Sequence, residues 1–338
     1  MGNKHQCWIT WNQSARSRTL ASLLNATLHE ISIENSKIMR HVLSPLLTIR
    51  ALLKEKPRVI FLQYSFLLLI VIAGYKLARL GRLVIVCDCH TKALRRTAPG
   101  LLNWVFWPLK KLSFRFADVT IISNNGMADD IRRLHSNFYI LPDKIPKIEF
   151  DKLPARDDRH CVYISSFAVD EPIYEIFDVA AALNPTEKIY WTGRIPKDLR
   201  LPPDKPSNLI FTGYLNSDQY HNLIGNADCL LALTTEENCL QCGGYEALAV
   251  GVPIVLSHTD ALREYFGEAA IYTDHAPHHI AQSIRRAIAD RALLTAEIVK
   301  VTAQRGVEFE QFYEKVRSAV DRETARHWHK HVRADDGS

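Results

Sequence analysis

Short apolar segments alternate with stretches of helical periodicity along most of the chain, and this alternation constrains the fold more than any other feature. Apolar runs of strand length occur in the first half at 7–10, 28–33, 59–63, 83–88 and 119–123. They recur in the second half at 161–165, 188–191, 208–211, 229–234, 253–256 and 270–272. Strands separated by crossover helices form parallel sheets. The sequence therefore predicts an α/β protein with doubly wound, Rossmann-like parallel sheets.

The alternation is interrupted once, at residues 141–159, where three prolines and many charges predict an interdomain linker. A chain of 338 residues is also too long for one ordinary core. We expect an N-terminal domain over 1–150, a C-terminal domain over 151–310, and a helix with a polar tail over 311–338 that packs back on the N-terminal domain. Ligands of such sheets bind at the carboxyl ends of the strands, so the predicted site is the cleft between the domains.

Charge and cysteine content limit the function classes. The net charge of +5 suits anionic small molecules or an acidic membrane surface, and it is too weak to indicate nucleic acid as a partner. The seven scattered cysteines predict free thiols in a reducing cytoplasm. Cys239 and Cys242 have the spacing of half a metal site, but no second pair accompanies them, so no metal is expected.

Two segments bear on membrane contact. Residues 59–75 approach a spanning length, but a buried strand followed by a buried helix explains the same letters, and the start of the chain lacks the apolar core of a signal peptide. Residues 101–116 combine aromatic side chains with Lys110, Lys111 and Arg115. This composition fits peripheral contact at the inner face of a membrane, and it equally fits a core helix with a basic edge.

The segment 228–257 carries the most chemical information. A buried strand leads into a polar loop, and Gly243 and Gly244 then open a helix that bears Glu246 in its first turn. Backbone amides at such a helix start favour a phosphate, and a carboxylate beside them can accept hydrogen bonds from a ribose diol. An ordinary helix start with an acidic residue explains the pattern equally well.

The segment Glu246-Ala-Leu-Ala-Val-Gly251-Val-Pro253 resembles the second half of the signature of family 4 glycosyltransferases, which adopt the GT-B fold of two Rossmann-like domains. The resemblance covers nearly all of the C-terminal domain and, more loosely, the first domain. It implies a glycosyltransferase that needs no metal or other cofactor and uses a nucleotide sugar as donor.

The resemblance also implies roles for individual residues. Glu246 would bind the ribose, and the start of its helix would face the diphosphate, at Gly243, Gly244 and Tyr245. The donor sugar would meet the preceding loop, at Asn238, Cys239 and Leu240. The nucleobase would lie near a loop that follows another strand, at Gly213 and Tyr214.

The chain departs from the family pattern in two places. Asn238 stands where the family has its first glutamate, and Ser165 and Ser166 stand where the family often has an arginine and a lysine on the diphosphate. Ser166 can still hydrogen-bond a phosphate. Positive charge must then come from elsewhere, and the candidates, each equally explained as a surface arginine, are Arg194, Arg16 and Arg18.

The first domain offers His90 as the candidate catalytic residue. It follows a strand end, where related enzymes often place a histidine near the reacting sugar, and Asp88 is a rival base. An ordinary loop histidine is the alternative. The sequence thus predicts a hexosyltransferase that acts on a glycan or lipid-linked acceptor in polysaccharide or glycoconjugate synthesis. A sugar-nucleotide epimerase and a non-catalytic GT-B partner subunit remain alternatives.

Overall fold

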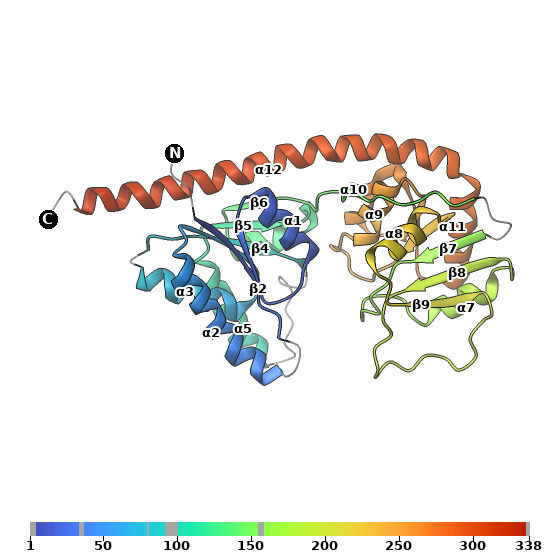
Figure 1. The fold of residues 1–338 in the computed structure, drawn as a ribbon, viewed down its shortest axis with the longest axis horizontal. Helices are drawn as coiled ribbons and strands as arrows, with labels where there is room; N and C mark the ends of the chain where they lie inside the picture. The colour runs from blue at the N-terminus through green and yellow to red at the C-terminus, as the bar shows by residue number, and fades with distance from the viewer. Residues whose placement is uncertain (1–4, 34–36, 80, 92–100, 155–158, 336–338) are drawn as a thin grey trace. The chain divides into compact units, whose positions relative to one another are not determined.

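The computed structural model describes residues 5–33, 37–79, 81–91, 101–154 and 159–335. The chain divides into two compact units (Figure 1). Unit 1 contains residues 1–144 and 309–338, and unit 2 contains residues 145–308. The sequence placed these boundaries near 150 and 310.

The described strands of unit 1 form a six-stranded parallel sheet with the order β2-β1-β3-β4-β5-β6. Their bounds are β1 (Gln6–Thr10), β2 (Thr27–Glu30), β3 (Val59–Gln63), β4 (Val84–Cys89), β5 (Val119–Ile122) and β6 (Phe138–Ile140). The strand order reverses between β1 and β3, which pair in parallel with Gln6 beside Val59. The short strand β6 was not predicted, because only three residues of it pair with β5.

Helices cover both faces of this sheet because successive residues of each strand point to opposite sides. Ile9 and Ile60 join one buried cluster with residues of α2 (Lys37–Glu55), α3 (Phe66–Ala78) and α5 (Leu101–Phe114). Trp8 and Phe61 join the opposite cluster with α1 (Ala15–Leu23) and the end of α12 (Arg291–Asp335). Figure 1 shows α2, α3 and α5 gathered on one side of unit 1. A short helical segment, η1 (Asn125–Met127) and α6 (Ala128–Arg132), precedes β6.

Unit 2 repeats this plan with a second sheet of six described parallel strands, in the order β12-β11-β10-β7-β8-β9. Their bounds are β7 (Arg159–Tyr163), β8 (Glu187–Thr192), β9 (Leu209–Gly213), β10 (Cys229–Ala232), β11 (Ile254–Ser257) and β12 (Ala270–Thr273). One face packs on α7 (Glu175–Ala182) and α11 (Pro277–Ala289). The other packs on α8 (Ser217–Gly225), α9 (Cys242–Val250), α10 (Asp260–Phe266), η2 (Gly267–Ala269) and the first turns of α12. The predicted α/β class with two doubly wound sheets is confirmed.

Local sequence explains where the helices of unit 2 begin and end. Asn216 and Gln219 form a reciprocal capping box that starts α8, and the Thr259 hydroxyl accepts from the Leu262 amide at the start of α10. Gly251 ends α9 in the left-handed region with φ of 72°, a conformation that glycine adopts without strain. Pro253 then prevents the helix from continuing.

The fold bears on the expectations about residues 59–75, a membrane span and the cysteines. Residues 59–75 form β3 and most of α3, as the strand-then-helix interpretation predicted. Within the described parts of the chain, no helix has both the length and the apolar character needed to cross a bilayer. All seven cysteines are free, and five of them are buried.

Candidate functional site

The topology of unit 2 identifies the place where a ligand is expected. From β7 the chain adds β8 and β9 on one side, and it then returns to add β10, β11 and β12 on the other. The order therefore reverses between β7 and β10, which lie side by side. Ligands of open α/β sheets bind outside the carboxyl ends of the strands at such a reversal. The loops at this point are 164–174 and 233–241.

The loop between β10 and α9 contains the predicted sugar contacts. Asn238, Cys239 and Leu240 are half-buried there, and the Cys239 amide donates to the Glu236 carbonyl at 3.3 Å. Leu240 also packs against the buried cluster that holds α9 on the sheet. The backbone hydrogen bond and the packing of Leu240 fix this loop, and they thereby fix the position of Asn238 at the strand reversal.

The start of α9 differs from the prediction in one respect. The helix begins at Cys242, after Gln241 as its N-cap, so Glu246 is its fifth residue and lies in the second turn. Gly243 and Gly244 are both buried, and each has a packing requirement. A Cβ on Gly244 would lie 2.3 Å from Phe266 Cζ, and a Cβ on Gly243 would lie 2.9 Å from Ala232 Cβ. The two glycines let α9 approach β10 and α10 closely, which is a reason independent of any ligand.

The amides at this helix start remain relevant to a phosphate. The first amides of an α-helix have no intrahelical carbonyl partner in the i−4 position. The Gly244 amide instead donates to the Gln241 carbonyl at 3.0 Å. Tyr245 is turned inward and packs against Tyr265 and Phe266. Of the backbone groups predicted to face a diphosphate, Gly244 thus has a local acceptor, and the Tyr245 side chain belongs to the core.

Glu246 is held by a residue that the sequence did not indicate. The Tyr220 hydroxyl, on α8, donates to Glu246 Oε2 at 2.5 Å. Burial raises the pKa of Glu246, and the hydrogen bond from Tyr220 opposes this only in part. Burial and the neighbouring Glu246 carboxylate raise the pKa of Tyr220 well above its usual range, so the phenol remains a donor. The predicted ribose contact would use the other carboxylate oxygen, Oε1, as the acceptor.

The loop after β7 explains the two serines found in place of cations. Ser165 Oγ donates to Glu171 Oε2 at 2.5 Å, and the Ser166 amide and hydroxyl donate to Glu171 Oε1 at 3.1 and 2.9 Å. Phe167 is held with φ of 56°, which is rare for a side chain of this size, and its ring stacks on Trp191 at 5.0 Å. The serines are thus committed to Glu171, which makes Ser166 a poorer phosphate donor than expected.

Asp170 connects this loop to the one after β10. Its carboxylate accepts from Thr234 Oγ1 at 3.0 Å, and its carbonyl accepts from the Thr235 amide at 2.7 Å. Asp170 therefore holds the two loops of the strand reversal together, whereas Glu171 fixes the serines within its own loop. Sequence reasoning missed these roles, and the only signal was their position after a strand.

Arg194 and Tyr214 meet at the far side of the same sheet edge. Arg194 follows β8 and Tyr214 follows β9, and the guanidinium lies 5.7 Å from the centre of the exposed Tyr214 ring. Gly213 ends β9 with φ of 68°. An exposed aromatic ring beside a cation is suited to a nucleobase or an anionic group.

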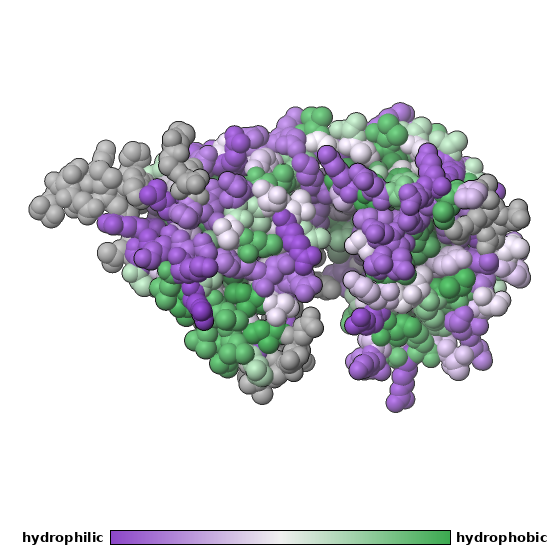
Figure 2. Space-filling view, viewed as in Figure 1, coloured by the Kyte–Doolittle hydropathy of each residue, from purple (hydrophilic) through white to green (hydrophobic). Residues whose placement is uncertain are grey.

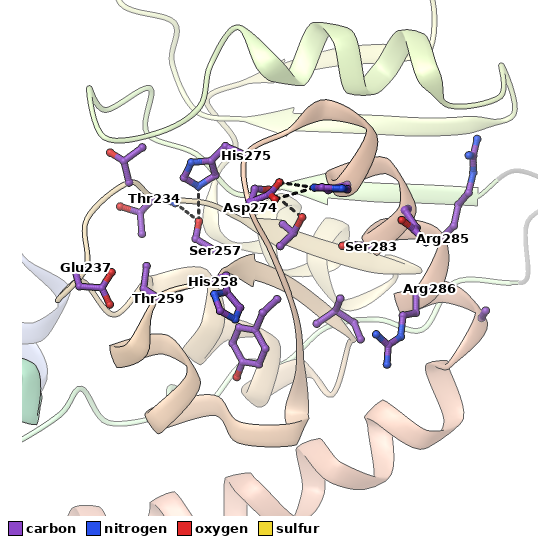
Figure 3. Close-up of a pocket in the computed structure, with 17 residues that line it drawn as sticks. Thr234, Glu237, Ser257, His258, Thr259, Asp274, His275, Ser283, Arg285 and Arg286 are labelled. Atoms are coloured by element: carbon purple, nitrogen blue, oxygen red, sulfur yellow. Dashed lines mark hydrogen bonds and ion pairs between the residues drawn. The ribbon is translucent and has the colours of Figure 1, made fainter.

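A pocket of about 1090 Å³ lies beside the strand reversal, at the carboxyl ends of β10, β11 and β12 and along α11 (Figure 3). Hydroxyl and imidazole groups dominate its lining. Ser257 Oγ accepts from the Thr234 amide at 2.8 Å and lies 2.9 Å from His275 Nε2. His279 Nδ1 lies 2.8 Å from the Asp274 carboxylate. The lining also includes the charged side chains of Glu237, Asp274, Arg285 and Arg286, and its many hydroxyl groups suit a polyol.

In unit 1 the structure revises two predicted roles. Arg16 is almost fully buried, and its guanidinium donates to both oxygens of Asp88, to Asp143 at 2.8 Å and to the Leu141 carbonyl at 2.8 Å. Asp88 is only 1% exposed. Arg16 and Asp88 form a buried ion pair with each other. This geometry argues against Arg16 as a diphosphate ligand and against Asp88 as the base. Arg18 pairs with Glu30 at 2.9 Å at the surface.

His90 differs from these two residues. It directly follows β4 and is partly exposed, and its Nε2 lies 3.7 Å from Asp88 Oδ2. That separation exceeds a hydrogen bond but is short enough for electrostatic attraction. His90 is therefore partly exposed at a strand end, while its Nε2 atom is buried near the Asp88 carboxylate without a hydrogen bond to any of the described residues.

In the part of the chain that the structure describes, no three or more His, Cys, Asp or Glu side chains are grouped so that they could hold a metal ion. Cys242 is the first residue of α9, Cys239 lies in the preceding loop, and the two form no disulfide.

Comparison with known proteins adds family information. Residues 159–290 match the sequence profile of the family described as Glycosyl transferases group 1. No curated protein matches the chain by sequence. The matched range spans the sheet of unit 2 from β7 through α11, including the strand reversal, and the resemblance inferred from Glu246 to Pro253 is confirmed.

Solved structures match the chain over nearly its full length. Anabaena HepE, solved with UDP-glucose, is 13% identical with a TM-score of 0.68, over 93% of this chain and 99% of that one. The glycotransferase of kitacinnamycin is 13% identical with a TM-score of 0.57, over 95% and 100%. A putative UDP-N-acetylglucosamine 2-epimerase from Listeria monocytogenes is 9% identical with a TM-score of 0.59, over 88% and 91%. At such identities the likeness shows the fold, and the predicted GT-B architecture is confirmed.

Proposed function

We propose that this chain, whose residues 159–290 match the profile of the glycosyl transferases group 1 family, is a glycosyltransferase that moves a hexosyl group from a uridine diphosphate sugar to a glycan or lipid-linked acceptor. The observation that carries the proposal is the Tyr220-bound carboxylate of Glu246 beside the reversal between β7 and β10. The choice of uridine is supported by Anabaena HepE, a structural neighbour solved with UDP-glucose.

The donor contacts follow from the edge of the sheet in unit 2. Glu246 accepts hydrogen bonds from the ribose, and the amides at the start of α9 meet the diphosphate, with Gly243 at the close approach. The base lies against Gly213 and Tyr214, and Arg194 supplies positive charge. Asn238, Cys239 and Leu240 contact the donor sugar, and the hydroxyl-lined pocket beside them offers further groups to saccharide hydroxyls.

His90 is proposed to orient the donor or to carry the proton during transfer. The His90 imidazole is partly exposed at a strand end, whereas Asp88 is committed to Arg16. No metal or other cofactor is included in this proposal, because protein groups supply the charge and the proton.

Nucleotide binding is the first test. Thermal unfolding of the full chain would be followed with UDP, GDP, ADP, CMP and dTDP, for the wild type, Glu246→Ala and the control Arg18→Ala. We expect UDP to raise the Tm of the wild type and of Arg18→Ala, but not of Glu246→Ala. No response to any nucleotide would contradict the assigned donor class and favour a non-catalytic subunit.

Product analysis tests the reaction. Donor consumption by the wild type should require an added acceptor and should be lost in His90→Ala with nucleotide binding retained. Conversion of a UDP-sugar into its epimer without any acceptor would instead establish the epimerase, an activity named for one of the structural neighbours.

The acceptor and the place of action belong to the same proposal. We place the protein in the cytoplasm, in polysaccharide or glycoconjugate synthesis, with peripheral contact to a membrane that holds a lipid-linked acceptor. Of the segment 101–116 first considered for this contact, the side chains of 101–106 lie outside the described residues. Lys111 and Arg115 are exposed.

A further inference from the structure

Helix α2 of unit 1 exposes its apolar side to solvent. Its exposed large apolar residues recur at intervals of three and four, which places them within about 80° of one another around a helix of 3.6 residues per turn. The residues of this stripe are Met39 (49% exposed), Val42 (56%), Leu46 (57%), Ile49 (40%) and Leu53 (59%). We call this set the α2 stripe.

The inward side of the same helix is partly polar. Ser44 and Thr48 are fully buried there, along with Leu52. The Thr48 hydroxyl accepts from Trp11 Nε1 at 2.9 Å and donates to the Ser44 carbonyl at 2.7 Å. An ordinary surface helix buries its most apolar side. Since α2 is attached through these groups, the α2 stripe contributes nothing to the core.

Neighbouring helices extend the apolar surface. α3 exposes Ile70 and Leu77, and α5 exposes Leu109 and Leu112. In the view of Figure 2, hydrophobic residues gather over the part of unit 1 that Figure 1 labels α2. Single exposed apolar residues are ordinary, but a gathered set marks a surface that contacts another partner.

The segment that carries this surface is rich in basic residues, and the cations exposed beside the apolar residues indicate which partner. Residues 37–117 contain 15 Lys and Arg but only two Asp and Glu, a net charge of +13 within a chain of +5. The remaining residues therefore carry −8. Of the two acids, Asp88 is buried against Arg16. Exposed cations lie beside the apolar residues, at Arg50 and Lys54 on α2 and at Lys111 and Arg115 near the end of α5.

We propose that the α2 stripe docks unit 1 onto a bilayer rich in anionic phospholipids, with the helix lying in the plane of the interface. Apolar side chains enter the acyl boundary, and the flanking cations meet the headgroups. A second copy of the chain fits this surface less well, because a two-fold interface would bring the exposed cations Arg50, Lys54, Lys111 and Arg115 of the two copies together. The inference deepens the membrane contact of the proposed function, but lipid docking needs neither donor nor acceptor.

Vesicle sedimentation of the full chain tests the docking. Vesicles of phosphatidylcholine alone would be compared with vesicles that also contain phosphatidylglycerol. We expect the wild type to bind the anionic vesicles only. The double variant Leu46→Gln with Leu53→Gln should bind these vesicles at least about tenfold more weakly. Arg50→Gln and Lys54→Gln should each weaken it about fivefold. Leu293→Gln, which changes a similarly exposed leucine (64%) on α12, is the matched control and should bind like the wild type.

Nucleotide response separates this proposal from the proposed function. All five proteins should keep the wild-type Tm shift with UDP. A wild type that responds to UDP but binds no vesicle would overturn the docking and leave the transferase standing. Equal binding to both vesicle types would overturn the role of charge. Self-association that is lost in the double leucine variant, without vesicle binding, would assign the surface to a second copy instead.

Discussion

At the scale of single residues, the proposed ribose ligand Glu246 is also a source of lost stability. Its pKa is raised by burial, so the ionised form is less favourable in the folded protein than in the unfolded chain. The contribution of Glu246 to stability is therefore most favourable below the unfolded pKa of about 4.3, and this contribution is lost as the pH rises through the folded value. A carboxylate kept under these conditions is typical of a functional site.

Glu246→Gln should therefore stabilise the free protein at neutral pH. Glutamine still accepts from Tyr220 but carries no charge. We expect the Tm at pH 7 to rise by about 1–3 °C, with the difference vanishing near pH 4. UDP should no longer raise the Tm, because the amide accepts a diol less well. An unchanged or lower Tm at pH 7 would show that burial of the charge is not the dominant effect.

Arg16 and Asp88 show how burial changes a residue's role. The pair was predicted from two strand ends as a ligand and a base, yet Arg16 has 4% and Asp88 1% of its side chain exposed. Removing one member leaves a buried charge without compensation. Arg18 forms a similar ion pair with Glu30, but 54% of the Arg18 side chain is exposed to solvent.

Arg16→Ala should destabilise the protein by about 3–5 kcal/mol, measured by urea unfolding. Arg18→Ala is the matched control and should cost about 0–1 kcal/mol, because an exposed pair contributes little. Equal effects of the two substitutions would contradict a structural role for the buried pair.

At the scale of elements, the position of α9 depends on two residues without side chains. A Cβ added to Gly244 would lie 2.3 Å from Phe266 Cζ, and one added to Gly243 would lie 2.9 Å from Ala232 Cβ. The helix therefore lies so close to α10 and β10 that neither position has room for a side chain. Such an approach also fixes where the helix amides and Glu246 emerge at the sheet edge. The packing of α9 is thus the condition for the geometry of the candidate site.

Gly244→Ala should destabilise the fold by about 1–3 kcal/mol through overpacking against Phe266. Gly306→Ala provides the control, since that helical glycine in α12 has no atom within 4 Å of the added methyl group. We expect it to stabilise by about 0.4–1 kcal/mol. Partial rescue of Gly244→Ala by Phe266→Leu would confirm the contact, and a neutral Gly244→Ala would contradict it.

At the scale of the whole molecule, unit 1 is assembled from two distant parts of the chain. Phe309, Val316, Ala319 and Val320 of α12 are buried in the cluster that contains Trp8 and Phe61. Further along α12, His327 Nε2 lies 2.9 Å from Asp118 Oδ1, and Lys76 Nζ lies 2.6 Å from Asp118 Oδ2. The last helix is therefore part of the first unit's core, as well as its charge network.

Asp118 should make this assembly sensitive to acid. Burial acts to raise its pKa, but His327, Lys76 and the Ile85 amide outweigh burial and hold the pKa below its usual range. The group thus stabilises the fold above the unfolded pKa of about 3.9, and this contribution is lost as the pH falls through the folded value. Asp118→Asn should cost about 2 kcal/mol or more at pH 7 and less below pH 4, measured by denaturant unfolding. A difference independent of pH would contradict the ion-pair origin.

The sequence by itself determined the class of fold. Strand-length apolar runs, helix starts such as Asn216 to Gln219, and the stop at Gly251 and Pro253 are local features, and each follows from hydrophobic periodicity or backbone geometry within a few residues. The family motif could be recognised without the structure because Glu246 to Pro253 are consecutive in the sequence.

Only the tertiary structure decided which polar side chains are available. Burial and partners arise where distant segments meet, as Tyr220 meets Glu246, and as Arg16 meets Asp88 across 72 positions of sequence. The apolar side of α2 is the converse case. Its periodicity predicts a helix that buries this side, and only the fold shows that Thr48 faces the core while Leu46 faces solvent.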